Sequence, residues 1–250
     1  MNSSWIELEK ELDKWGRGKH KACFWWRDDD LEAPGPKFQR LLNLRRSTPI
    51  SLAVIPKTIQ NHVAKSIYGC DKIDIIQHGF LHKNHEIASL KKNEFGPERL
   101  YLQVKEELSI GKKILEGVFG DRFFAVFVPP WNRMADIHSH CLRDLGFLAL
   151  SGFGTKSLGH LQNINTHIDP ISWKTNETFL GTEIMISKLI LMLKQERRKA
   201  GFITPIGLLT HHKQMNEDVW KFFDQLLKTL QTHPHVTFKS IREIINETKY

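Results

Sequence analysis

The chain has 250 residues, enough to bury a sizeable core in one domain, and its 40% hydrophobic and 26% charged residues exclude a disordered or fibrous protein. Its formal net charge is +8, from 36 Lys and Arg against 28 Asp and Glu. Because the basic clusters are short, we expect no nucleic-acid partner, and the charge either favours an anionic substrate carrier or has no specific meaning. No apolar run approaches the roughly 18 residues of a transmembrane segment.

The cysteines and the N-terminus bear on the cellular compartment. Cys23, Cys70 and Cys141 are odd in number and form no CxxC pair, which predicts buried, reduced thiols. The first residues lack the basic-then-apolar order of a signal peptide. We therefore expect a cytoplasmic protein.

Helices and strands are predicted to alternate along the chain. A helix at about residues 4–15 precedes the first strand and is expected to pack on the domain, because its apolar side chains share one helical face. Strands are predicted at residues 23–27, 50–55, 73–77, 123–128, 147–150, 164–166, 207–210 and 236–238. Further helices are predicted at residues 38–44, 98–119, 136–145, 182–199 and 217–230 and at the C-terminus. This alternation favours a mostly parallel α/β architecture in one domain over residues 1–250.

Polar residues of the types used in catalysis fall just beyond the predicted strands. They are Asp29, Asp30, His78, Trp131, Asp169 and His211. In a parallel barrel the carboxyl ends of the strands carry the active site. The sequence therefore predicts that these residues converge on one face.

Three consecutive aspartates, Asp28, Asp29 and Asp30, follow Arg27 and the apolar run at residues 23–26. Neighbouring carboxylates repel each other, so they need a cation or a shared proton. Asp is also common in helix caps and surface turns. A turn in solvent rarely follows so apolar a strand, and we therefore weigh a metal site against the cap.

His78 and His82 lie four residues apart after another apolar run. Neutral imidazoles bind divalent transition metals, whereas a pair of surface histidines is the simpler explanation. His85 lies three residues further and is an alternative to one of the two ligands. No Glu stands between the pair as in HExxH, which excludes a zincin.

Taken together, these segments resemble the five ordered motifs of the polysaccharide deacetylases (NodB-homology domain, carbohydrate esterase family four). The resemblance runs from Asp28 to His211 and covers most of the chain. It implies an α/β fold, a distorted (β/α) barrel of about seven strands. It also implies a metal-dependent hydrolase.

The first two motifs of the family carry the metal. By resemblance, Asp29 is the general base, and Asp30, His78 and His82 are the metal ligands. The aspartate pair is alternatively Asp28 and Asp29. Gly79 stands where the family has Ser or Thr, which removes a hydroxyl that stabilises the loop but removes no ligand.

The third motif resembles residues 128–131. Val128 replaces the arginine that in the family pairs with the catalytic base, and Arg27 or Arg133 is expected to supply the missing cation. The backbone N–H of Trp131 is implied as an oxyanion donor. Asn132 and Arg133 follow the motif and are candidates for binding substrate.

The last two motifs resemble residues 169–173 and 209–211. The resemblance implies that His211 is the general acid and that Asp169 orients it, although His212 is a competitor for the role of acid. Trp131 and Trp173 offer flat faces to a sugar ring, and simple core packing is at least as good an explanation for Trp173.

The resulting prediction is an enzyme, a zinc-dependent N-deacetylase acting on an acetylated amino sugar. A nucleotide-linked or lipid-linked precursor is the preferred substrate. Asp and His ligands also suit cobalt, manganese or nickel. The alternatives are another metal-dependent amide or ester hydrolase on the same barrel, and a non-catalytic relative that binds a carbohydrate or nucleotide sugar.

Overall fold

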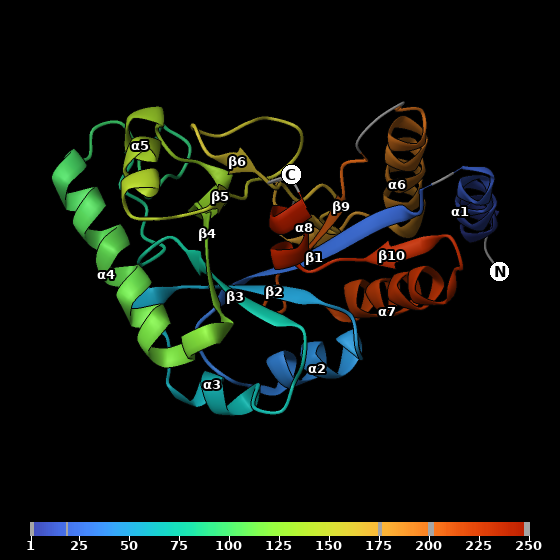
Figure 1. Cartoon of the computed structure of the whole chain (residues 1–250), viewed down its shortest axis with the longest axis horizontal. Helices are drawn as coiled ribbons and strands as arrows, with labels where there is room; N and C mark the ends of the chain where they lie inside the picture. The colour runs from blue at the N-terminus through green and yellow to red at the C-terminus, as the bar shows by residue number, and fades with distance from the viewer. Residues whose placement is uncertain (1–2, 19, 175–176, 200–202, 248–250) are drawn as a thin grey trace.

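The computed structural model describes residues 3–18, 20–174, 177–199 and 203–247. Strands form a curled sheet at the centre, and helices surround it (Figure 1). The main sheet is parallel throughout. Its strands are β1 (Ala22–Leu31), β2 (Ile50–Val54), β3 (Ile73–His78), β4 (Phe123–Val128), β5 (Ala149–Leu150), β6 (Gln162–Asn163), β9 (Ile206–Thr210) and β10 (Val236–Phe238).

The long strand β1 organises this sheet. Phe24 pairs with both β10 and β9, and Asp28 pairs with both β2 and β9. Because a strand has two edges, β10 and β2 follow each other along one edge of β1 while β9 occupies the other. From β2 the sheet continues through β3, β4, β5 and β6.

The segment at residues 162–168 closes the sheet into a barrel. On one side, the N–H groups of Ile164 and Thr166 donate to the carbonyls of Leu150 and Gly152. On the other side, the N–H groups of His167 and Ile168 donate to Gly207 of β9. A side chain at position 207 would clash with the backbone of residues 165–166, which explains the glycine there. The predicted distorted (β/α) barrel is confirmed, with seven positions around its wall.

The helices cover the outside of the barrel. They are α1 (Ser3–Asp13), α2 (Pro36–Arg45), α3 (His62–Ser66), α4 (Tyr101–Phe119), α5 (Asp136–Asp144), α6 (Thr182–Arg197), α7 (Glu217–Thr232) and α8 (Ile241–Glu247). Short 3-10 turns η1 to η4 lie at Lys14–Arg17, Pro56–Thr58, Gly120–Arg122 and Pro130–Asn132, and a two-stranded sheet pairs β7 (Ile171–Ser172) with β8 (Thr178–Phe179). α1 packs on α6 at the periphery (Figure 1).

The strands contribute to three clusters of buried side chains, two of which meet at β1. Phe24 and Trp26 of β1 face the outer helices, and Trp26 packs on Phe223 of α7. Trp25 faces inward and joins a cluster that includes Ile244 of α8. Successive side chains of a strand point to opposite faces, which explains this division. Helix α8 therefore closes one end of the barrel.

Several predicted elements differ in extent. β1 continues through the aspartates to Leu31, so that Asp29 and Asp30 lie within the last residues of the strand rather than beyond it. β5 and β6 have two residues each, and β6 lies at 162–163 rather than 164–166. Cys23 and Cys141 are buried, whereas Cys70 is only half-buried, and all three are free thiols. No helix in the described part of the chain is long and apolar enough to span a membrane.

Candidate functional site

The end of β1 brings two consecutive aspartates to the same site. Neighbouring residues of a regular strand point to opposite faces. Asp30 breaks this alternation with a φ of 67°, and the register with β2 shifts between Asp28 and Leu31. As a result Asp29 and Asp30 both face the barrel mouth.

Asp28 points the other way. Its Oδ2 accepts hydrogen bonds from the Thr210 hydroxyl at 2.6 Å and from the His212 N–H at 3.1 Å, and His212 Nδ1–H donates to Oδ1 at 2.5 Å. Asp28 thus joins β1 to the end of β9, away from the histidines of the site. Of the two aspartate pairs considered, the structure brings Asp29 and Asp30 to the candidate site. His212 is occupied by Asp28.

Asp30, His78 and His82 converge at the ends of β1 and β3. Oδ1 of Asp30 lies 3.0 Å from Nε2 of His78 and 3.3 Å from Nε2 of His82. The other ring nitrogen of His78, Nδ1–H, donates to the Val128 carbonyl at 3.0 Å. This bond turns Nε2 toward Asp30, as the outer hydrogen bond of a metal-ligating histidine does. His85, the alternative ligand, is exposed and outside this cluster.

A buried carboxylate that sequence reasoning missed holds the loop between the two histidines. Glu94 Oε1 accepts the N–H of Leu81 at 2.7 Å, and Oε2 accepts the N–H of Phe80 at 3.2 Å. Gly79 has a φ of 58°, and a side chain there would clash with Glu94 and Pro130. The glycine is therefore required by backbone and packing, and Glu94 fixes the loop. The only sequence signal was an acidic residue in an otherwise basic stretch.

Arg27 lies against Asp29, two residues further along the same face of β1. Its Nη2 donates to Asp29 Oδ2 at 2.9 Å, and Nε lies 2.8 Å from Oδ1 as an ion pair outside good hydrogen-bond alignment. Nη1 donates to the carbonyl and hydroxyl of Ser151, and Nη2 also donates to Asn132 Oδ1 at 3.0 Å. The side chains of Arg27 and Asp29 are both buried. Of the two arginines considered, Arg27 thus pairs with Asp29.

The turn after β4 carries Trp131, Asn132 and Arg133. Trp131 and Asn132 both have φ of 54°, an uncommon conformation for large side chains that is frequent at functional sites. The Trp131 ring lies 4.4 Å from the His82 ring. The first N–H groups of a helical turn have no partner within it, which leaves the Trp131 N–H for an acceptor in the site. Arg133 donates to the Lys92 carbonyl, away from Asp29.

His211 lies across the mouth from the His78 cluster. Its Nε2 is 3.8 Å from Oδ2 of Asp29, and its ring meets the edge of Trp173 at 4.6 Å. Asp169 accepts the Trp173 indole N–H at 2.7 Å and the Ile171 N–H at 2.9 Å. Nδ1 of His211 has no hydrogen-bond partner in the described residues. Asp169 therefore reaches His211 through Trp173 rather than by a direct hydrogen bond.

The electrostatics of the cluster follow from burial and from the neighbouring charges. Burial alone would raise the pKa of Asp30, but the hydrogen bond and charge of His78 outweigh it and lower the pKa well below its usual range. The same bond raises the pKa of His78 against the effect of burial. Burial and His78 lower the pKa of His82. Burial also raises the pKa of Asp169, in part offset by His211 and Trp173.

The donor set fits a divalent metal ion. One carboxylate oxygen and two imidazole nitrogens lie within 4.8 Å of one another. Such acceptor atoms repel each other unless a proton or a cation lies between them, and the nearby guanidinium of Arg27 is already bound to Asp29. Asp30, His78 and His82 could hold the ion and leave a position open for water.

A second group of possible ligands lies outside the barrel. Asp136 and His140 of α5 meet His160, with Asp136 Oδ2 3.3 Å from His160 Nε2 and the two histidine rings stacked at 4.2 Å. All three side chains are exposed, unlike the cluster at the barrel mouth. This surface group is separate from the candidate site.

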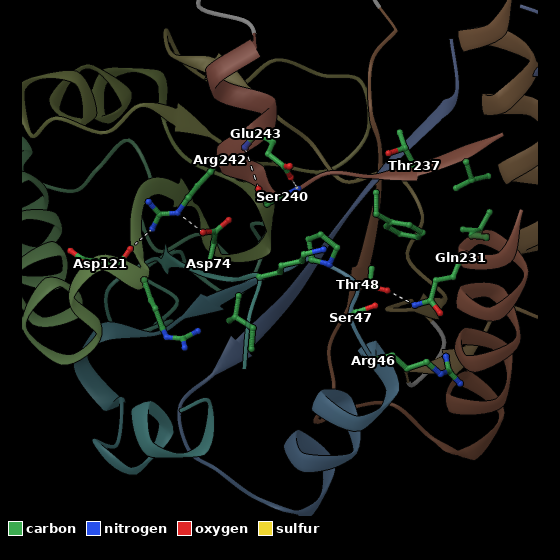
Figure 2. Close-up of a pocket in the computed structure, with 17 residues that line it drawn as sticks. Arg46, Ser47, Thr48, Asp74, Asp121, Gln231, Thr237, Ser240, Arg242 and Glu243 are labelled. Atoms are coloured by element: carbon green, nitrogen blue, oxygen red, sulfur yellow. Dashed lines mark hydrogen bonds and ion pairs between the residues drawn. The ribbon is translucent and has the colours of Figure 1, made fainter. Parts of the chain in front are cut away.

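A cavity of about 840 Å³ opens at the opposite end of the barrel, where β2, β3 and β4 begin (Figure 2). Two of its charged residues pair with each other: Arg242 lies 2.5 Å from Asp74 and also donates to the Asp121 carbonyl. Its lining includes none of the residues at the barrel mouth. This cavity is therefore separate from the candidate site at the barrel mouth.

Comparison with known proteins shows which fold this is. No family model and no curated protein matches the sequence. A Mycobacterium smegmatis protein named as a polysaccharide deacetylase superposes with a TM-score of 0.64 at 15% identity, over 93% of this chain and 92% of its own. A family 4 acetyl xylan esterase from Clostridium thermocellum, solved with a cobalt ion, gives 0.60 at 12% over 91% and 92%. The peptidoglycan deacetylase PdaC from Bacillus subtilis gives 0.56 at 14% over 92% and 94%. The chain thus has the NodB-like barrel that its motifs predicted.

Proposed function

We propose that this chain is a metal-dependent hydrolase that removes the acetyl group from an acetylated amino sugar. The observation that carries the proposal is the position of Asp29. It is held by Arg27, and it lies between the Asp30, His78 and His82 cluster on one side and His211 on the other. A base, a possible metal site and a second proton-transfer group thus share one mouth of a deacetylase fold.

Asp30, His78 and His82 would hold the metal ion, with zinc as the preferred ion and cobalt, manganese or nickel as alternatives. When bound, such an ion supplies Lewis-acid polarisation and makes water a better nucleophile at neutral pH. The other steps belong to residues of this chain.

Asp29 is the proposed general base. Its carboxylate accepts the proton of the water that attacks the acetyl carbonyl, and Arg27 fixes its orientation and balances its charge. Positioned general bases contribute about 10²–10⁴-fold to a rate. The buried pairing with Arg27 therefore preorganises the base before substrate binds.

Trp131 and His211 complete the proposed chemistry. The backbone N–H of Trp131 donates to the oxygen that becomes negative in the transition state, and losing such a donor typically costs about 10²–10³-fold. His211 protonates the leaving amine, and Trp173, fixed by Asp169, holds the face of its ring. These assignments use Asp169 as a positioning residue.

The proposed substrate is a sugar attached to an anionic carrier, nucleotide or lipid. Trp131 and the exposed Trp173 flank the mouth and offer ring faces to a sugar. Arg133 and the remaining amide group of Asn132 lie beside Trp131, and the net charge of +8 suits a phosphate. The three free thiols are compatible with a cytoplasmic location, which stays a prediction.

The test is metal content and acetate release, measured on the same preparations. His78→Ala and His82→Ala are expected to lose one bound metal ion per chain and all activity. His85→Ala is the matched control, because it changes a neighbouring histidine outside the cluster. Asp29→Asn should keep the metal and lose acetate release on acetylated nucleotide sugars, lipid-linked sugars and chitooligosaccharides. Metal content equal in all three histidine variants would contradict the proposal.

The same assays separate the alternatives. A non-catalytic binding relative would retain the metal and bind sugars but release no acetate from any of them. Another amide or ester hydrolase would release acid from small amides or esters and not from amino sugars.

A further inference from the structure

The loop that follows the second candidate ligand has an unusual exposed surface. Within the loop segment (residues 81–93) the exposed side chains are aliphatic, basic or small. They are Leu81, Lys83, His85, Ile87, Ala88, Ser89, Leu90, Lys91 and Lys92. The acid of the segment, Glu86, is half-buried, with its carboxylate packed over Gly96. The exposed residues of the loop segment therefore include basic and apolar side chains but no acid.

Two aliphatic side chains form its tip. Ile87 is 67% exposed and Leu90 is 57% exposed, and a turn in which the Leu90 N–H donates to the Ile87 carbonyl at 3.0 Å brings them together. The base of the tip is fixed by Asn84, whose side chain bonds the backbone of Glu86 and Asn93. An ordered loop thus holds apolar groups in water. Long ordered loops without regular structure usually serve function.

Basic residues flank this tip in the chain, and one of them, Lys92, reaches the candidate mouth. Lys83, Lys91 and Lys92 form no ion pair with any residue that the structure describes. Lys92 Nζ lies 6.0 Å from the Trp131 ring, which in turn contacts His82. A continuous surface therefore leads from the apolar tip through free ammonium groups to the candidate metal site.

We propose that the loop segment docks on an anionic lipid bilayer and so presents the barrel mouth to an acetylated amino sugar carried on lipid phosphate. Apolar side chains flanked by lysines bind membrane interfaces by burial of the tip and attraction to anionic headgroups. The absence of exposed acids from the segment matches the charge of such a surface. The choice of a lipid-linked substrate rests on the proposed function, whereas docking itself does not.

The experiment is co-sedimentation of the full chain with vesicles of phosphatidylglycerol and phosphatidylcholine, and with phosphatidylcholine alone. Binding is expected to the anionic vesicles and to weaken as salt is added. Ile87→Ser with Leu90→Ser should reduce it, and Lys91→Gln with Lys92→Gln should lower the partition constant about 25-fold, at about fivefold for each lysine. The matched controls, Ile184→Ser with Leu191→Ser on α6 and Lys10→Gln with Lys113→Gln, change exposed residues elsewhere and should bind like the unmodified chain.

Circular dichroism spectra would check that each variant is folded. The Ile87 and Leu90 variant should keep the turnover of water-soluble acetylated sugars and lose turnover of vesicle-borne ones. Any of three results would overturn the docking proposal. These are equal binding to both vesicle types, no binding to either, and an equal loss of binding in the loop and control variants. Vesicle binding lost only in the loop variants, with no acetate released from any substrate, would uphold docking and reject the proposed function instead.

Discussion

Arg27 is engaged by carbonyl, hydroxyl, amide and carboxylate oxygens, and its side chain is completely buried. Removing one partner of a buried ion pair leaves the other charge without compensation, which costs about 3–5 kcal/mol. Arg27→Gln is therefore expected to lower the free energy of unfolding by about that amount, measured by urea denaturation.

Arg27→Lys keeps the charge but loses the fork of donors that holds Asp29. We expect this variant to fold and to lose about a hundredfold in kcat, because a displaced catalytic group costs rates of that order. Acetate release from the proposed substrates measures it. Arg143→Gln on α5 is the control, since the Arg143 guanidinium donates to the His160 carbonyl outside the barrel mouth, and an equal loss of kcat there would contradict the role of Arg27.

Glu94 is predicted to act through the metal ligands that it positions. Glu94→Ala removes both acceptors of the Phe80 and Leu81 N–H groups, which hold the loop between His78 and His82. Loss of such an outer contact typically costs about 10–100-fold in metal affinity. Competition with a chelating dye measures the affinity. Glu98→Ala, an exposed glutamate nearby, should leave it unchanged, and an unaltered affinity in Glu94→Ala would exclude the positioning role.

For single residues, the sequence predicted which side chains come together, but it predicted less well how each one is oriented. The convergence of Asp30, His78 and His82 followed from motif order, because parallel strands end at one edge. The direction of Asp30 did not follow, since it depends on the positive φ of that residue. Glu94 was missed because its partners lie more than ten residues away and no motif contains it.

Among the elements, the closing segment at residues 162–168 is the irregular part of the barrel wall. His167 joins it to β9, because the Gly207 N–H donates to His167 Nδ1 at 2.9 Å. Burial, aided by the charges of Lys188 and Lys199, lowers the pKa of His167 to about 4 from 6.5. The closure of the barrel thus depends on a histidine that stays neutral.

This histidine predicts a pH dependence of stability. Below about pH 6.5 the unfolded chain takes up a proton at residue 167 that the folded chain refuses until about pH 4. The contribution of His167 to the free energy of unfolding is therefore complete above about pH 6.5 and falls by at most about 1.4 kcal/mol per pH unit below it. Urea denaturation at several pH values tests this. His167→Asn should flatten the curve between these limits, and an unchanged slope would refute it.

The regular elements were predictable where apolar runs are long. Strands β2, β3, β4 and β9 lie within a residue or two of their predicted positions. β5 was predicted two residues too long and β6 was misplaced, because two-residue strands leave no periodicity in a sequence. The closing segment holds its place by single backbone bonds to β5 and β9 rather than by a hydrophobic pattern.

For the molecule as a whole, one end of the barrel carries the candidate site, and the other carries a partly buried ion pair. Arg242 at the beginning of α8 pairs with buried Asp74 and donates to the Phe123 carbonyl, at the end remote from Asp30. Arg242→Gln should lower the free energy of unfolding by about 1–3 kcal/mol, through the unpaired groups that it leaves. Thermal unfolding and acetate release should respond differently: the melting temperature falls and kcat/KM stays. A matching fall in kcat/KM would show that the two ends are coupled.

The fold was the most predictable property, because alternating strands and helices admit few arrangements. That residues 1–250 form one domain stays a prediction. The charge of +8 could not indicate by itself where a partner binds, since the basic residues are spread along the chain. The position of the Lys92 ammonium group beside Trp131 became visible only in three dimensions.

The position of α8 across one end of the barrel has a consequence for how substrate and product of the proposed reaction enter and leave. Trp25 and Ile244 belong to one packed cluster, with which the described residues fill the interior of the barrel at this end. In the proposed reaction, water, the sugar and acetate would all use the mouth at Asp30, and the products must leave it before the next substrate binds. Acetate should accordingly compete with the incoming sugar for this mouth. A carrier that moved the deacetylated product away from the mouth would speed the cycle.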